Sequence, residues 1–201
     1  MQYTIALLLS FAAFSVGPAP VYSQSGAASG QSPRAELALG YSYLRSNAPP
    51  GGCTCFSLNG GNATLAWPLG TGRFALVGDV SAGHAGSIGS GGDSLTLSTY
   101  TAGMRYTPRP AHSSLRPFGQ ALIGVAHSSG SLVKGQGPVV SNAGAAFAAN
   151  LGGGLDLSLN HRFSVRLIEA DYLLTTFDNA SNNRQNNLRL GAGVVVRFGR
   201  R

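Results

Sequence analysis

The sequence predicts an all-β protein, a single eight-stranded antiparallel up-and-down β-barrel that crosses a membrane. In the C-terminal stretch 188–198, apolar residues alternate with small or charged ones. Similar alternating segments recur along the chain, separated by connections rich in Gly, Ser, Asn and Pro. Charged residues make up only 10% of the chain and 29 residues are glycine. Beyond the N-terminus no apolar run approaches the length of a membrane-spanning helix, so strands are favoured as the crossing elements.

The last strand, 188–198, shows the alternating pattern most clearly. Strict period-two alternation indicates a strand whose two faces differ. Its eleven residues match a tilted strand that spans a bilayer. We therefore expect the apolar face to meet lipid, while Arg189 and Arg197 point into the barrel. The apolar face consists of Leu188, Leu190, Ala192, Val194, Val196 and Phe198.

Seven further strands complete the predicted barrel. They are expected at 34–45, 58–67, 73–84, 95–106, 117–127, 146–157 and 163–174. The connections between them alternate between long, polar segments and shorter turns. Long extracellular loops and short periplasmic turns are typical of outer-membrane barrels. Because the strand number is even, both termini are expected on the periplasmic side.

The N-terminus has the features of a secretory signal peptide. An apolar segment at 5–16 is too short to cross a membrane, and Gly17, Pro18 and Pro20 end it. The expected organisation is a signal peptide at 1–23, a polar lead at 24–33, a barrel domain at 34–198 and a short basic tail at 199–201.

Aromatic residues are concentrated near the expected strand ends. A girdle is predicted at the periplasmic rim, and a second group lies nearer the other rim. Aromatic side chains favour the two interfaces of a bilayer. The periplasmic girdle is Trp67, Phe74, Tyr106, Phe163 and Phe198, and the second group is Tyr41, Tyr43, Tyr100 and Phe177.

Charged residues fall on the predicted inner faces of the strands. An eight-stranded barrel is just wide enough for its side chains to fill, and buried charges must be paired. Four cations meet five anions there, which favours mutual pairing and a closed lumen over an ion-selective ring of one sign. The expected lumen network is Glu36, Asp79, Arg105, Asp156, Arg166, Glu169, Asp171, Arg189 and Arg197.

Two local predictions follow from these charges. Closure of the barrel between its first and last strands should pair Glu36 with Arg197 near the periplasmic rim. Regular alternation would place Arg166 and Glu169 on opposite faces, and a charge facing lipid is unfavourable. We therefore expect a β-bulge around residues 167–168, which turns Glu169 and Asp171 inward toward Arg189.

Two other groups of residues invite a chemical interpretation. Cys53 and Cys55 in the first long loop could form a strained disulfide, remain free thiols or contribute to a metal or redox site, for which no further ligands lie nearby in sequence. His127, followed by Ser128 and Ser129, could serve a hydrolase, with Asp178 as an acidic partner. The alternative is a set of ordinary polar residues at a strand end. We expect no cofactor and no resident metal ion.

The stretch from Glu36 to Phe198 resembles the small eight-stranded barrels related to the membrane domain of OmpA. The resemblance depends on strand spacing, the LGAGVVVRF ending and the signal peptide. In that family the terminal aromatic residue is usually the last one, whereas here Gly199, Arg200 and Arg201 follow it.

The resemblance implies a non-enzymatic outer-membrane protein with a role in envelope structure or in surface interaction through its extracellular loops. A small channel or ligand-binding barrel is the first alternative, and a lipid-modifying enzyme is the second. Expected partners are outer-membrane lipid, the barrel assembly machinery during insertion and an unidentified extracellular partner. Nucleic acid is not expected despite the net charge of +7, because the arginines are scattered singly.

Overall fold

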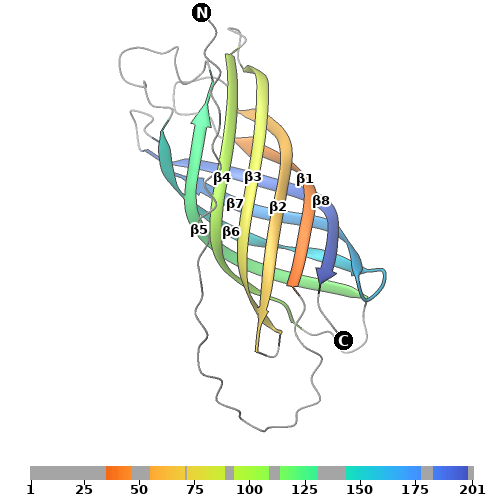
Figure 1. The fold of residues 1–201 in the computed structure, drawn as a ribbon. Coiled ribbons are helices and arrows are strands. Elements are labelled where there is room, and N and C mark those ends of the chain that lie inside the picture. The colour runs from red at the N-terminus through yellow and green to blue at the C-terminus, as the bar shows by residue number, and fades with distance from the viewer. Residues whose placement is uncertain are drawn as a thin grey trace, which may run out of the picture.

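Eight antiparallel strands close into one barrel in chain order, with β8 pairing back onto β1 (Figure 1). The computed structural model describes residues 35–46, 55–70, 72–88, 93–108, 114–130, 144–177 and 183–198. The strands are β1 (Ala35–Ser46), β2 (Phe56–Leu69), β3 (Phe74–Ile88), β4 (Asp93–Tyr106), β5 (Leu115–Ser129), β6 (Ala145–Ser158), β7 (Phe163–Thr175) and β8 (Gln185–Phe198).

The predicted fold class is confirmed, and every expected strand is present. Several strands run further than the sequence pattern indicated. β3 continues to Ile88, and β8 begins at Gln185. Small and polar residues in these extensions obscure the alternation, but backbone pairing does not depend on it. The described residues contain no helix that is long and apolar enough to cross a membrane. The predicted signal peptide, polar lead and basic tail lie outside the described residues.

The two ends of the barrel differ. We call the end with the β2–β3, β4–β5 and β6–β7 connections the turn end; β1 starts there and β8 finishes there. The opposite end is the loop end. The β2–β3 turn is closed by a hydrogen bond from the Gly72 amide to the Leu69 carbonyl oxygen, 2.8 Å long. Gly70 and Gly72 have φ of 50° and 77°, which a residue with a Cβ rarely adopts.

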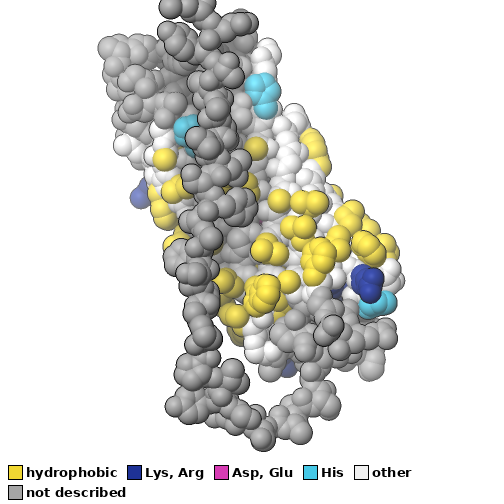
Figure 2. Space-filling view, in the orientation of Figure 1, with side chains coloured by type: hydrophobic (Ala, Val, Ile, Leu, Met, Phe, Trp, Pro, Cys, Tyr) yellow, Lys and Arg dark blue, Asp and Glu magenta, His cyan; other side chains and the backbone are white. Residues whose placement is uncertain are grey.

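The outer wall is largely apolar and charged side chains lie inside, the reverse of a water-soluble domain. Large hydrophobic side chains such as Leu39, Leu65, Ile123 and Leu151 are exposed on the outer wall. Figure 2 shows one face of the molecule, with hydrophobic side chains spread over the described part of its outer surface. Arginines and carboxylates are instead among the most buried residues. The alternation along the strands therefore places apolar side chains outside and charged side chains inside, as a barrel in a lipid bilayer requires.

The aromatic residues occupy the predicted rim at the turn end. The five members of the turn-end girdle are all exposed, and the Phe74 and Tyr106 ring centroids are 5.2 Å apart. Tyr41 and Tyr100 are exposed near the middle of β1 and β4, not at the opposite rim as predicted. Phe177 also departs from the prediction, because it is partly buried and packs against apolar residues inside the barrel. The turn-end girdle consists of Trp67, Phe74, Tyr106, Phe163 and Phe198.

The predicted β-bulge in β7 is present. Arg166 pairs with Asp156 of β6 while Ile168 pairs with Leu155, which leaves Leu167 without a place in the ladder. The register to β8 also shifts between Arg166 and Glu169. Leu167 and Ile168 are consecutive and both exposed, whereas Arg166 and Glu169 are both buried. The extra residue thus keeps every charge of β7 inside.

The interior near the loop end is filled by an apolar cluster that the sequence pattern did not reveal. Leu58, Ala126 and Ala148 in it are wholly excluded from solvent, and Phe56, Leu95 and Phe177 pack against it. We call this the loop-end cluster. Its buried members are Leu44, Leu58, Ala85, Ile88, Leu97, Ala126, Ala148 and Leu173.

Candidate functional site in the barrel lumen

Arg189 of β8 is at the centre of the lumen. Its Nη1 lies 2.7 Å from Asp79 Oδ1 on β3, and its Nη2 lies 2.7 Å from Asp171 Oδ2 on β7. The same Nη2 is 3.5 Å from Glu169 Oε1. Thr64 donates a hydrogen bond of 2.7 Å to the second oxygen of Asp79. One guanidinium thus joins β3, β7 and β8 across the barrel.

Arg166 forms a second centre one level closer to the turn end. Its Nε is 2.9 Å from Asp156 Oδ1, and its Nη1 is 2.7 Å from Glu169 Oε2. Gln120 Nε2 donates to Glu169 Oε1 over 2.9 Å. Glu169 therefore accepts a hydrogen bond from Arg166 on Oε2, while its Oε1 lies near Arg189. This carboxylate links the two arginine centres.

Glu36 closes the network at the turn end. Its Oε1 accepts from Arg197 Nε at 2.9 Å, which is the pair predicted at the seam between β1 and β8. It also accepts from Arg116 Nη1 at 3.0 Å. Arg197 donates further to Ser164 Oγ at 2.6 Å. The rim is thus held by two arginines on one carboxylate.

Arg116 is a lumen residue that the sequence analysis missed. The predicted turn ended at residue 115 and the predicted strand began at 117, so Arg116 was assigned to neither. Alternation with the inward-facing Phe118 and Gln120 would have placed it inside. With Arg116 included, the lumen contains five arginines and five carboxylates, one cation more than predicted.

Arg105 does not form an ion pair with a carboxylate of the described residues, contrary to the prediction. Its Nε and Nη2 donate to Gln120 Oε1 at 3.1 and 2.8 Å. Its guanidinium carbon lies 4.2 Å from the centroid of the Phe118 ring, and that of Arg166 lies 4.4 Å from the same centroid. A neutral amide and the ring face therefore hold this buried cation in place of an acid.

The described lumen leaves little free space. A void of about 10 Å³ lies between the central ion pairs and the loop-end cluster, with Arg189, Ser81 and Leu97 among its walls. That is room for about one water molecule. Ser81 and Thr99 share a hydrogen bond of 2.7 Å at the same level. Ion pairs, hydroxyls and the apolar cluster thus follow one another from the turn end to the loop end.

Comparison with solved structures identifies the architecture. Neisserial surface protein A superposes with a TM-score of 0.62 and 13% identity, over 82% of this chain and 97% of its own. Ail, the attachment invasion locus protein of Yersinia pestis, superposes with a TM-score of 0.54 and 18% identity, over 82% of this chain and 98% of its own. That Ail structure is a complex with the heparin analogue sucrose octasulfate.

The chain has the fold of small eight-stranded outer-membrane β-barrels. The predicted resemblance to OmpA-like barrels is thereby confirmed at the level of the fold. No protein-family model matches the sequence, and none of the curated proteins compared with it does.

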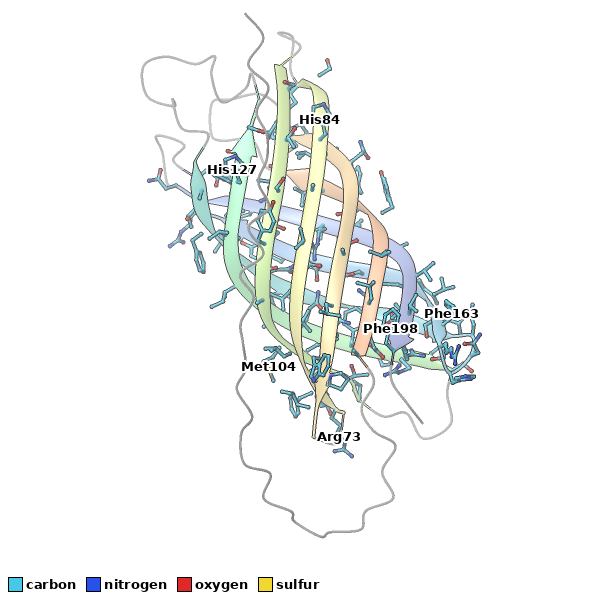
Figure 3. The ribbon with its side chains drawn as sticks, in the orientation of Figure 1. Arg73, His84, Met104, His127, Phe163 and Phe198 are labelled. Carbon is cyan, nitrogen blue, oxygen red and sulfur yellow. The ribbon has the colours of Figure 1, made fainter. Side chains whose placement is uncertain are left out.

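Of the residues proposed for a hydrolase, His127 and Ser128 lie on opposite faces of the barrel wall. His127 is exposed on the outer wall near the loop end, whereas the following Ser128 is buried inside (Figure 3). Successive residues of a strand point to opposite faces, so this histidine is not directed toward that hydroxyl. Asp178 lies outside the described residues. In the described part of the chain, no three His, Cys, Asp or Glu side chains gather in a way that could hold a metal ion.

Only one of the two cysteines lies within the described residues. Cys55 is exposed immediately before β2. Cys53 lies outside the described residues, so the possible Cys53–Cys55 disulfide stays a prediction.

Proposed function

We propose that this chain is a non-enzymatic integral protein of the bacterial outer membrane that forms no open pore. Its role is in envelope structure or in surface interaction through the loop end. The observation that carries the proposal is the filled lumen, in which five arginines and five carboxylates are followed by the loop-end cluster. A barrel whose interior is occupied by its own side chains is left with its outer wall and its ends as working surfaces.

The outer wall supports the membrane location. Exposed apolar side chains lie between an aromatic girdle at the turn end and the exposed aromatic residues Phe147 and Tyr172 near the loop end. This is the distribution that a bilayer favours. We further propose that the turn end, where β1 starts and β8 finishes, faces the periplasm, and that the loop end faces outward. Outer-membrane lipid and the assembly machinery are then partners by necessity.

The comparisons support a surface role without specifying a ligand. One neighbour is named as a surface protein, and another is named for attachment and invasion. The loop-end connections of this chain, at 47–55, 89–92, 130–144 and 176–184, are therefore the segments to test for a partner. Deletion of each segment, scored by binding of expressing cells to host cells and to polysaccharide-coated surfaces, assigns the interaction to a loop.

Conductance separates this proposal from the channel alternative. Purified protein, refolded until it shows the heat-dependent change in electrophoretic mobility of a closed barrel, is added to a planar lipid bilayer. We expect no steady single-channel current, while a porin in the same apparatus conducts. Stable open-channel currents from the unmodified protein would refute the closed-lumen function. An altered lipid A profile in expressing cells would instead favour the enzyme alternative.

A further inference from the structure

The net charge of the chain lies entirely outside the lumen. The sequence contains 14 basic and 7 acidic residues, of which five arginines and five carboxylates are inside the barrel. Nine basic and two acidic residues remain for the ends and connections, which accounts for the whole net charge of +7. The part of the sequence outside the lumen network is therefore strongly basic, although the network itself has equal numbers of cations and anions.

This surplus is unevenly divided between the two ends. In the sequence, the turn-end connections and the segments just before β1 and just after β8 contain basic residues and no acidic residue. The loop-end segments carry Arg45, Lys134 and Arg184, balanced in part by Asp93 and Asp178. The basic residues of the turn-end segments are Arg34, Arg73, Arg109, Arg162, Arg200 and Arg201.

Two of the turn-end arginines are described, and both are held just beyond the aromatic girdle. Arg73 precedes Phe74, and its carbonyl oxygen accepts from the Thr107 amide at 2.8 Å. Arg162 precedes Phe163, and its carbonyl oxygen accepts from the Arg197 amide at 2.8 Å. These bonds tie the backbone of each turn to the strand end beside it.

The β6–β7 turn is fixed further by Asn160. Its Oδ1 accepts from the amides of Arg162 and Phe163 at 2.8 and 2.9 Å. Arg73 and Arg162 are both exposed, and neither forms an ion pair with a carboxylate of the described residues. Figure 3 places Arg73 at the tip of the β2–β3 turn, at the opposite end from His84 and His127.

We propose that Arg73 and Arg162, in turns on opposite sides of the barrel, each form a docking site for the phosphate group of an anionic phospholipid at the turn-end face of the membrane. The inference rests on the proposed membrane location. Tryptophan, tyrosine and phenylalanine rings mark the depth of the bilayer interface, so a cation one residue beyond that girdle lies at headgroup depth. Cationic side chains at this depth attract anionic lipid, and a guanidinium suits phosphate by its paired donors. The barrel would thus be surrounded at its turn end by selected anionic lipid.

The experiment measures lipid selectivity at the protein surface. The full chain is refolded into phosphatidylcholine vesicles that contain a trace of spin-labelled phosphatidylglycerol or spin-labelled phosphatidylcholine. The fraction of motionally restricted label gives the relative affinity for each lipid. We expect a preference for phosphatidylglycerol on the order of two- to five-fold at low salt. Because exposed charges are screened, the preference should approach unity in molar salt.

Matched variants assign the preference to these sites. The double variant R73Q/R162Q removes the two charges and should reduce the selectivity, while the other basic residues of the turn-end segments account for the remainder. The variant R45Q removes one exposed charge at the loop end and should retain it. The heat-dependent mobility shift checks that each variant has folded. Equal affinity for the two lipids, or selectivity in R73Q/R162Q equal to that of the unmodified protein, would overturn the docking sites.

The same measurement separates failure of these sites from failure of the proposed function. If neither label shows a restricted component, the chain is not an integral membrane barrel, and both proposals fall. If restricted lipid is present without selectivity, only the docking sites are wrong. Conductance of R73Q/R162Q should match that of the unmodified protein, because neither residue faces the lumen.

Discussion

Arg189 and Asp79 lie 110 positions apart in sequence, yet Nη1 and Oδ1 of these residues are 2.7 Å apart across the lumen. Their strands, β8 and β3, are not neighbours in the sheet. The side chains are 4% and 0% exposed, so the pair is removed from water and from screening by salt. A single guanidinium thereby connects opposite parts of the barrel wall, and its removal is the most direct test of the lumen network.

Replacing Arg189 with Ala should destabilise the barrel strongly. The change leaves Asp79 and Asp171 buried without their cation, and breaking a buried pair in this way costs about 3–5 kcal/mol. The free energy of unfolding in urea, measured in lipid vesicles, gives the loss. Arg45→Ala is the control, because Arg45 is exposed and its bond to Ser57 should contribute little. Equal stability of the two variants would show that the central pairs do not hold the barrel.

Glu36→Gln should cost less than the change at Arg189. Glu36 joins Arg116 and Arg197, but the site is at the rim, with side chains 14%, 32% and 8% exposed. Water can solvate part of the released charge, so we expect a loss of about 1–2 kcal/mol. Urea unfolding of the unmodified protein and this variant at low and high salt checks both points. The difference should shrink as salt rises, whereas the loss from Arg189→Ala should change little.

Phe118→Leu should weaken the barrel although it keeps the site apolar. The ring of Phe118 lies beside the guanidinium groups of both Arg105 and Arg166. Leucine offers no ring face, and a desolvated cation–π contact contributes about 2 kcal/mol. Phe147→Leu is a matched control, because Phe147 is exposed on the outer wall. If the two substitutions have equal effects on urea unfolding, the ring does not stabilise Arg105.

Deleting Leu167 should leave a folded barrel. Leu167 is the extra residue of the bulge, and without it Arg166, Ile168 and Glu169 alternate regularly with both charges still inward. The heat-dependent mobility shift after refolding into lipid measures the outcome.

Deleting Ala170 in the same strand is the matched control. That deletion removes one residue between Glu169 and Asp171, so either register leaves one of these acids facing lipid. Because a charge on the lipid face is unfavourable, the refolded yield should fall well below that of the Leu167 deletion. Equal yields from both deletions would mean that β7 readjusts its register freely, contrary to the role assigned to the bulge.

The sequence by itself determined the strand number, the face of almost every residue and the bulge in β7. Each depends on period-two alternation, which is a local property, and on the unfavourable free energy of a charge in lipid. Arg166 and Glu169, three positions apart, were sufficient to predict the bulge. The seam pair of Glu36 and Arg197 also followed, because closure of an up-and-down barrel makes the first and last strands neighbours.

Tertiary structure decided which inward residues meet. Alternation states that a side chain points into the lumen, but the tilt and stagger of the strands set its height along the axis. That height brings Arg116 next to Glu36, and it places Arg105 beside Gln120 and the ring of Phe118. It also brings apolar residues from most of the strands together in the loop-end cluster. Stagger is a property of the closed sheet as a whole, and so no single strand's pattern records it.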